Sequence, residues 1–195
     1  MESTVLTQRF PALKLLASTD MATFEVPTTD LLAVVQFLRD QEGFDLLADL
    51  CGIDWPERQP RFGVVIHLLN TQKAQYVRLH VPAVNDSVPS IAALHPGANW
   101  HEREAYDMFG IQFAGHPDPR RILMWDSYPY HPLRKEFPLA GIEVPLPAAD
   151  VAEVTGQGVE PAPMMGGPFV SDGGKMSEGE PSGRDQSWTE KHPKR

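Results

Sequence analysis

Hydrophobic residues over the first hundred positions change between a helical spacing and a strand-like spacing. Within residues 30–42, four apolar residues follow the i, i+3, i+4, i+7 pattern of an amphipathic helix: Leu31, Val34, Val35 and Leu38. Thr28, Thr29 and Asp30 stand before this stripe as candidate capping residues, and Gly43 follows it as a stop signal. The pattern predicts a helix over residues 30–42.

Strand composition recurs on both sides of this helix. Five short runs are rich in apolar and β-branched residues and are separated by polar or proline-containing connections: 13–17, 23–26, 44–54, 62–70 and 75–81. The short polar link between the last two predicts an antiparallel hairpin. A few strands with two or three helices predict an α+β fold, in which a mixed or antiparallel sheet has helices on one face.

A second helix is expected over residues 99–109. Asn99 with Glu102 three residues later resembles a capping box, and Gly110 stands where a left-handed C-terminal cap belongs. Five prolines between residues 117 and 138 exclude a long helix beyond this point. We therefore expect residues 111–146 to run in extended and turn conformations.

The composition changes again near residue 147. Residues 147–195 contain 8 glycines and 6 prolines but only two aromatic residues, Phe169 and Trp188. Such a segment buries too little apolar area to offset its chain entropy alone. Its apolar stretch 161–170 is either a segment that lies on another surface or part of a loose tail. The sequence thus divides into an α+β domain (1–110), an extended Pro-rich partner-binding segment (111–146) and a low-complexity tail (147–195).

Charge and cysteine content exclude several classes of protein. The formal net charge of −9 disfavours nucleic-acid binding, which depends on clustered Lys and Arg. The single cysteine, Cys51, forms no intrachain disulfide and cannot supply the four thiolates of an iron–sulfur cluster; its apolar surroundings predict a buried residue. We expect no export signal, and the best apolar run, 62–69, is strand-sized rather than the roughly 18 residues of a membrane span.

The densest cluster of polar residues lies in the second predicted helix. Arg103, Glu104 and Asp107 are spaced to share one helix face. An ion-paired packing or interface helix accounts for this spacing, and a metal-dependent site built from His101, Glu104, Asp107 and His116 is the alternative. A di-metal bundle needs a second Glu-x-x-His motif, which the sequence lacks. Four histidines precede proline (His95, His116, His131 and His192) and so lack helical zinc-site spacing, while His67 is expected in the core or on a sheet face rather than as a metal ligand.

Two basic pairs follow this helix in the proline-rich segment, Arg120–Arg121 and Arg134–Lys135. Adjacent side chains on extended backbone point to opposite sides. One member of each pair is therefore expected to contact the acidic helix of this chain, and the other a neighbouring protein. Arginine suits such contacts because its planar guanidinium binds carboxylates at two points. Nucleotide-binding loops are incomplete in this sequence.

Several of these segments together resemble one family. The runs are 102–111, Phe113, 115–118, 120–124 and 131–139, which read EREAYDMFGI, F, GHPD, RRILM and HPLRKEFPL. They resemble the 30 kDa subunit, also called the C subunit, of proton-pumping NADH:quinone oxidoreductase, respiratory complex I. The resemblance is dense over residues 98–139 and weaker over 28–97. Tyr130 stands where the family commonly has glycine, Glu136 replaces a commoner aspartate, and the tail after Leu139 is not diagnostic.

This resemblance implies a non-redox subunit of the peripheral arm, with no catalytic, cofactor-binding or metal-binding residues in this chain. FMN, the iron–sulfur clusters, and the sites for NADH and quinone would belong to other parts of the complex. The implied partners are other peripheral-arm subunits, especially the 49 kDa and quinone-proximal iron–sulfur subunits. The implied location is the cytoplasmic side of the bacterial inner membrane, held there through the complex.

The partner-interface candidates are charged or imidazole side chains of the helix and the segment that follows: Glu102, Arg103, Glu104, Asp107, His116, Arg120, Arg121, His131, Arg134 and Lys135. Two alternatives stay open at this point. One is the equivalent subunit of a membrane-bound hydrogenase or a plastoquinone-reducing complex, and the other is a stand-alone metal-dependent enzyme.

Overall fold

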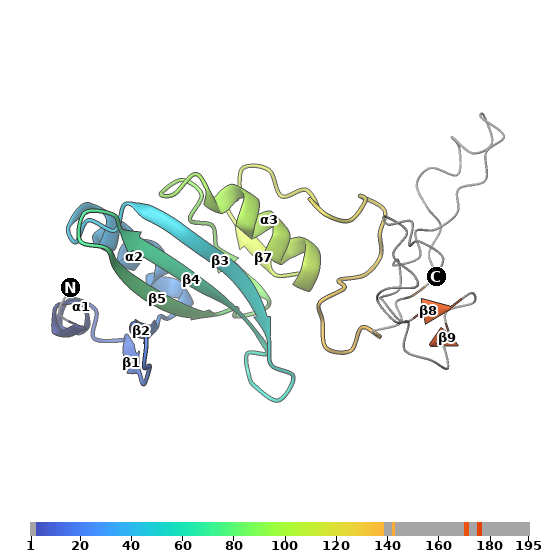
Figure 1. Ribbon diagram of the computed structural model, residues 1–195, viewed down its shortest axis with the longest axis horizontal. Helices are drawn as coiled ribbons and strands as arrows, with labels where there is room; N and C mark the ends of the chain where they lie inside the picture. Colours follow the sequence, from blue (N-terminus) through green and yellow to red (C-terminus); the bar gives the residue numbers. More distant parts are fainter. Residues whose placement is uncertain (1–2, 139–141, 143–169, 172–174, 177–195) are drawn as a thin grey trace, which may run out of the picture. The chain divides into compact units, whose positions relative to one another are not determined.

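The computed structural model describes residues 3–138, 142, 170–171 and 175–176 (Figure 1). It divides into two compact units, Met1–Lys135 and Glu136–Arg195. The helices and strands in chain order are α1 (Ser3–Arg9), β1 (Lys14–Leu16), β2 (Ala22–Glu25), the 3₁₀ turn η1 (Thr28–Asp30), α2 (Leu31–Asp40), β3 (Leu46–Asp54), β4 (Phe62–Asn70), β5 (Gln75–Pro82), β6 (Ser87–Pro89), α3 (Ala98–Phe109), β7 (Gln112–Ala114), β8 (Val170–Ser171) and β9 (Lys175–Met176).

The first unit is built on a five-stranded sheet with the strand order β1-β2-β5-β4-β3. Strands β4 and β5 form the predicted antiparallel hairpin, with Asn70 opposite Gln75 at its turn. Strand β3 pairs antiparallel with β4, and β1 pairs antiparallel with β2. Only β2 and β5 are parallel, which makes the sheet mixed. The α+β fold expected from the sequence is confirmed.

Helix α2 packs its apolar stripe on this sheet. The four residues of the stripe are fully buried among strand residues that include Phe24, Ile66 and Leu79. Burying a large aliphatic side chain contributes roughly 1.5–3 kcal/mol, so the stripe is a main source of stability here. The expectation that a side chain caps the N-terminus of α2 is wrong, because η1 leads directly into this helix. Thr28 instead donates its hydroxyl to the carbonyl of Pro82 at 2.5 Å.

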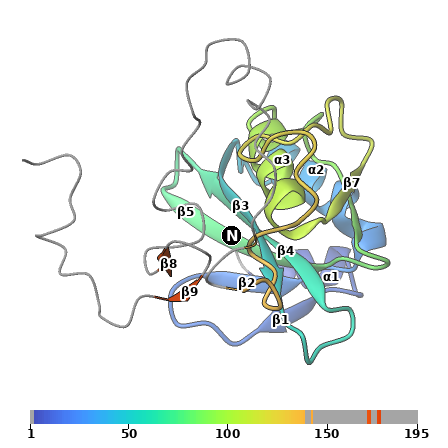
Figure 2. The same ribbon diagram turned by 90° about the vertical axis from the view of Figure 1, so that its right-hand side faces the viewer.

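Helix α3 lies on the same side of the sheet as α2 (Figure 2). Its last residue, Phe109, lies against the backbone of β3 at Gly52, where an added Cβ would lie 2.5 Å from the Phe109 ring. This close approach needs a residue without a side chain. The prediction of helices on one face is confirmed, and Gly52 fixes where the end of α3 meets the sheet.

Some elements differ from the sequence-based expectations. Cys51 was expected to be buried, but it is exposed on β3, because alternation along the strand turns it away from the core. Of the two positions expected for His67, core or sheet face, it takes the sheet face opposite Ile66 on β4, and its Nε2 accepts a hydrogen bond from Arg78 Nε at 2.8 Å. Helix α1 and the small parallel pair β6–β7 were not anticipated.

In the second unit, β8 and β9 form a short antiparallel pair with Val170 opposite Met176. Most of the expected tail, including residues 161–169, lies outside the described residues, so the division at residues 110 and 146 stays a prediction. Within the part of the chain that the structure describes, no helix has the length and apolar character needed to cross a bilayer.

Candidate functional site

The C-terminal end of α3 is capped by a segment more than twenty residues further along the chain. Gly110 adopts the predicted left-handed conformation (φ 79°) and donates its N–H to the carbonyl of Tyr106. The carbonyls of Asp107, Met108 and Phe109 then accept hydrogen bonds from three donors, which are His131 Nδ1 at 2.9 Å, Leu133 N at 3.0 Å and Arg134 Nε at 2.6 Å. These carbonyls have no partner inside the helix, so residues 131–134 complete its end.

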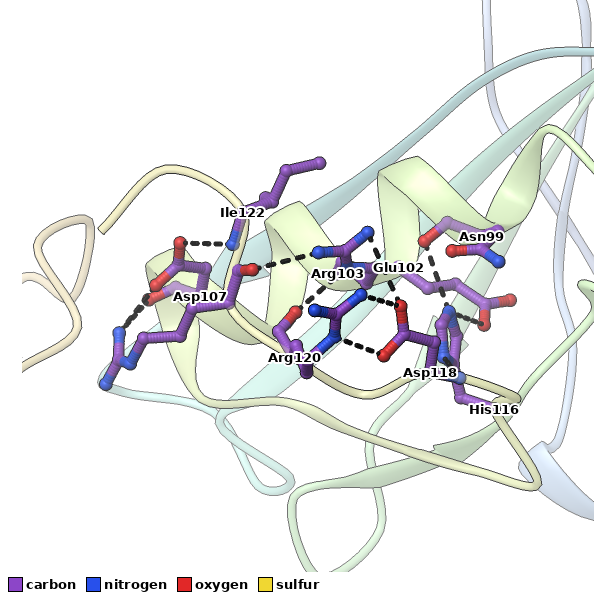
Figure 3. A network of polar contacts seen from close by, with 9 residues as sticks. Asn99, Glu102, Arg103, Asp107, His116, Asp118, Arg120 and Ile122 are labelled. Atoms are coloured by element: carbon purple, nitrogen blue, oxygen red, sulfur yellow. Dashed lines mark hydrogen bonds and ion pairs between the residues drawn. The ribbon is translucent and has the colours of Figure 1, made fainter. Parts of the chain in front are cut away.

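The carboxylate of Asp107 organises a second part of the same segment (Figure 3). Its Oδ2 accepts backbone N–H groups from three consecutive residues, Ile122, Leu123 and Met124, at 3.0, 2.7 and 2.8 Å. Its Oδ1 accepts the guanidinium of Arg121 at 2.5 Å. One buried carboxylate therefore holds the turn at residues 121–124 against α3.

Two opposing effects set the pKa of Asp107. Complete burial alone would raise it, but the backbone donors at 122–124 and the Arg121 guanidinium stabilise the charged form and hold the pKa below the ordinary value. Asp107 is therefore a carboxylate at neutral pH. A charged group with four donors is satisfied inside the protein, which fits a structural role better than proton transfer.

Arg103 holds the start of the same segment. Its Nε and Nη2 donate to the carbonyls of Arg120 and Arg121, both at 3.0 Å. Asp118 lies 3.9 Å from Arg103 and forms two short hydrogen bonds with Arg120, at 2.7 and 2.8 Å. Arg103 and Asp107 thus share a helix face that contacts residues 118–124, whereas Glu104, which was expected on the same face, is exposed.

Glu102 does not act as the expected capping residue. Helix α3 begins at Ala98, so Glu102 lies one turn inside it, and its Oε1 accepts the backbone N–H of Ile91 at 2.7 Å. The side chain is fully buried and its Oε2 has no hydrogen-bond partner among the described residues. Burial raises the pKa of Glu102 to about 7, against hydrogen bonds from Ser90 and Ile91 that act to lower it. The prediction failed because burial directs this side chain to the 90–91 connection.

His116 packs beside Glu102. The backbone N–H of Asp118 donates to His116 Nδ1 at 2.9 Å, which leaves the proton on Nε2, and Nε2 lies 3.1 Å from the carbonyl of Asn99. His116 Nε2 is also 3.8 Å from Glu102 Oε2. A cavity of about 10 Å³ beside both side chains is at the lower limit of the space that one water needs.

The four residues of the alternative metal site do not converge. His101 turns toward the sheet, with Nδ1 3.6 Å from Asp49, whereas Glu104 is exposed. Asp107 is occupied by residues 121–124, and His116 by Asn99 and Asp118. Among the described residues, no group of three His, Cys, Asp or Glu side chains is placed to hold a metal ion. Helical spacing alone did not show which side of α3 each residue occupies.

The two basic pairs divide between inward and outward contacts. Arg121 binds Asp107 of the chain's own helix, while the Arg120 side chain is 71% exposed and, within the described part of the chain, pairs with Asp118 alone. Arg134 reaches the helix through the Phe109 carbonyl rather than a carboxylate, and Lys135 is exposed. Burial lowers the pKa of His131, which is therefore a neutral donor at physiological pH.

One anchoring contact has no counterpart in the sequence patterns. Asp54, at the end of β3, accepts two hydrogen bonds from Arg61, at 2.6 and 2.7 Å, and one from the backbone N–H of Lys135 at 2.8 Å. The last of these joins residues 81 positions apart. An aspartate followed by an arginine in a loop is too common a pattern to predict such a contact.

This arrangement presents apolar side chains on a rigidly held but irregular surface. Trp100 and Leu123 are each 62% exposed and Leu133 is 51% exposed. The buried carboxylate of Asp107 is engaged by donors of the chain itself. Exposed apolar residues with arginine nearby, on a backbone held by many hydrogen bonds, are typical of a protein–protein interface.

Comparisons with known proteins agree with this picture. The family described as respiratory-chain NADH dehydrogenase, 30 Kd subunit, matches residues 24–143. The NADH-quinone oxidoreductase C subunit of Rhizobium leguminosarum bv. trifolii is 47% identical over 134 residues, which cover 65% of this chain and 67% of the relative. The corresponding C subunit of Sinorhizobium medicae is 50% identical over 122 residues, 61% of each chain. The matched part thus spans about two thirds or less of these relatives.

Solved structures share the fold. The structure titled Nqo5 of the trypsin-resistant fragment (1-134) matches with a TM-score of 0.54 and 27% identity, over 60% of this chain and 97% of that one. A chain of the membrane-bound sulfane sulfur reductase, an archaeal respiratory membrane complex, matches with a TM-score of 0.59 at 19% identity, which shows the fold alone. The family match covers more than half of the chain, so this protein belongs to the family of the 30 kDa subunit of respiratory-chain NADH dehydrogenase.

Proposed function

We propose that this chain is a non-redox subunit of the peripheral arm of proton-pumping NADH:quinone oxidoreductase. In this role it supports electron transfer from NADH, through FMN and iron–sulfur clusters held by other subunits, to quinone. It binds no cofactor itself. A chain with one cysteine, exposed on an edge strand, lacks the ligands that a cluster needs.

The observation that carries the proposal is the hydrogen bonding of residues 121–134 to α3. A proline-rich segment without regular structure is held in one conformation by Asp107 and by the three C-terminal carbonyls of the helix. Ordering these residues costs conformational entropy of about 1–2 kcal/mol each, and the contacts to α3 offset that cost before any partner arrives. A pre-organised surface of this kind supports tight binding to other subunits.

The partners that fit this role are neighbouring peripheral-arm subunits, in particular the 49 kDa subunit and the quinone-proximal iron–sulfur subunit. The chain would reach the cytoplasmic side of the inner membrane only through the complex. The extended segment 111–146 is the proposed partner-binding part, and the tail 147–195 is proposed to continue along the neighbouring surfaces.

The candidate interface residues fall into two groups in this proposal. The outward group, which would contact partners directly, comprises Glu104, Arg120 and Lys135. The inward group would position the surface from within the chain: Glu102, Arg103, Asp107, His116, Arg121, His131 and Arg134.

The test is affinity purification of the tagged full chain from its native membrane, followed by a visible spectrum. We expect the chain to bring down NADH:quinone reductase activity and brown iron–sulfur absorbance. After dissociation in high salt, the absorbance should stay with the other subunits and this chain should be colourless. Recovery of the chain without an iron–sulfur protein would contradict the proposal, and so would a chromophore that remains with the chain.

A further inference from the structure

A groove of about 330 Å³ runs between the end of β3, the end of α3 and residues 133–135. Its apolar lining residues are Ile53, Trp55, Phe109 and Leu133. The close approach of Phe109 to the backbone at Gly52 shapes the groove, because a side chain at residue 52 would overlap that ring. The volume is at the lower end of the range for ligand pockets, enough for one or two side chains.

The walls of the groove keep exposed apolar surface, although the Arg58 guanidinium lies 3.7 Å over the centroid of the Trp55 ring and His80 stacks against that ring at 6.3 Å. Leu133 is 51% exposed and Trp55 is 37% exposed, although both side chains belong to segments fixed by hydrogen bonds. Leu133 is held through its N–H to Met108, and Trp55 through its N–H to Arg61. Rigid, exposed apolar side chains around a hollow are typical of a site that receives an anchoring side chain.

The groove has more unpaired positive charge than negative charge. Among the described residues that line it, Asp54 is the one carboxylate, and its side chain is fully buried and engaged by Arg61 and the Lys135 backbone. The Lys135 ammonium is exposed and forms no ion pair within 4 Å among the described residues. Arg134 also forms no ion pair within 4 Å among the described residues, but it is half-buried and its Nε donates to the Phe109 carbonyl. In a chain of net charge −9, this edge is open to a carboxylate from outside.

We propose that this groove binds one segment of a partner polypeptide, which inserts an apolar side chain between Trp55 and Leu133 and places a carboxylate at Lys135. A small-molecule ligand fits less well, because such pockets orient their ligand with convergent polar groups, and the one carboxylate here is already engaged. The inference rests on the proposed function and identifies one point at which the subunit contacts a neighbour.

The first test places a photo-crosslinking amino acid at position 133 of the full chain within the purified complex. A matched probe at Leu15, which is 56% exposed on the other edge strand, β1, serves as the control. We expect the probe at 133 to mark one partner peptide that has Asp or Glu close to the crosslinked apolar residue, and that the probe at 15 does not mark. A crosslink within this chain or to a second copy of it would overturn the inference, as would the same products from both probes.

The second test uses charge. Lys135→Glu is expected to lower retention of the chain in the complex about tenfold during a salt wash, since a like charge then faces the partner carboxylate. Replacing that carboxylate by lysine should restore retention. Lys73→Glu, at an exposed lysine in the β4–β5 turn, is the control and should leave retention unchanged. Equal retention of Lys135→Glu and Lys73→Glu would contradict the groove assignment.

Two further measurements, thermal unfolding of the variants and copurification of the wild-type chain, show why a test failed. Thermal unfolding of the isolated Lys135→Glu and Lys135→Gln chains shows whether a loss of retention comes from misfolding. Reduced retention of a folded Lys135→Gln chain would still support the contact. If the wild-type chain does not copurify with the complex, the proposed function fails. If it copurifies but both tests at 133 and 135 are negative, only the groove inference fails.

Discussion

Asp107 Oδ1 lies 2.5 Å from Arg121 Nη1, and neither side chain is more than 10% exposed. This pair joins the last turn of α3 to the start of a segment without regular secondary structure. Because Asp107 also accepts three backbone N–H groups, the pair fixes the backbone of residues 121–124 and not only the orientation of one arginine. The conformation of the proposed interface therefore depends on a contact buried beneath it.

Arg121→Ala should destabilise the isolated full chain by about 3 kcal/mol, since a buried carboxylate loses its charged partner. Arg120→Ala is the matched control at the neighbouring position. Its side chain is 71% exposed, so the expected change in the free energy of unfolding is about 0–1 kcal/mol. Urea denaturation of the two variants measures the difference. Equal destabilisation would contradict the assignment of one inward and one outward arginine.

Asp107→Asn and Glu104→Gln form a second matched pair, on one helix. Asparagine at 107 would turn either an amide group or a weaker acceptor toward three backbone donors, and we expect a loss of about 2–3 kcal/mol in unfolding free energy. Glu104 is exposed, and its substitution should change stability by less than about 0.5 kcal/mol. Any effect of Glu104→Gln on assembly of the complex would then report a partner contact. Strong destabilisation by Glu104→Gln would show that Glu104 supports the fold.

Gly110→Ala tests the junction between α3 and residues 131–134. Alanine at a φ of 79° is strained, and its Cβ would lie within 2.8 Å of His131 and closer still to Arg134. Gly115→Ala is the matched control, since Gly115 has a φ of 82° and an added Cβ there would meet open space. Both variants should lose about 1–3 kcal/mol to backbone strain. Only Gly110→Ala should also expose the 131–134 segment to limited proteolysis.

The free energy of unfolding should depend on pH through the titration of Glu102. Its pKa rises from 4.5 to about 7 on folding, so between these values the folded chain binds more protons than the unfolded chain. The stabilising effect of the bound proton is complete below pH 4.5 and is lost as pH rises through 7, a change of about 3 kcal/mol. Glu102→Gln removes this titration, so its unfolding free energy should vary less from about pH 5 to 8 than that of the wild type. An unchanged profile would exclude Glu102 as the source.

Asp107 contributes in the opposite direction at lower pH. Its pKa is lowered on folding, so its contribution is present above the ordinary value of 3.8 and is lost as pH falls through the lower folded value. Wild-type stability should therefore fall below about pH 4. Asp107→Asn should remove the share of this acid-side loss that comes from residue 107, while the shares of other aspartates with a lowered pKa, such as Asp54, and the slope from Glu102 stay in place. The same pH series of urea denaturation curves separates the two carboxyl groups.

The sequence by itself determined the features that depend on short-range spacing. The stripe Leu31 to Leu38 specified α2, the run 62–81 specified the β4–β5 hairpin, and Gly110 specified the end of α3. Each of these patterns repeats within a few residues, so side-chain direction follows from the backbone period alone. The spaced residues 102–139 also carried the resemblance to the family, which the family match to residues 24–143 supports.

Only the tertiary structure decided which polar groups meet. Helical spacing placed Arg103 and Asp107 on one face, but the donors to Asp107 come from residues 14 to 17 positions further on, through backbone N–H groups that no side-chain pattern encodes. Glu102 and Glu104 are the same type of residue, yet packing buries Glu102 against residues 90–91 and leaves Glu104 in solvent. These contacts could not be predicted because an irregular segment has no repeating backbone geometry from which side-chain direction follows. Its conformation is set by the unsatisfied carbonyls and the buried carboxylate of the helix on which it lies.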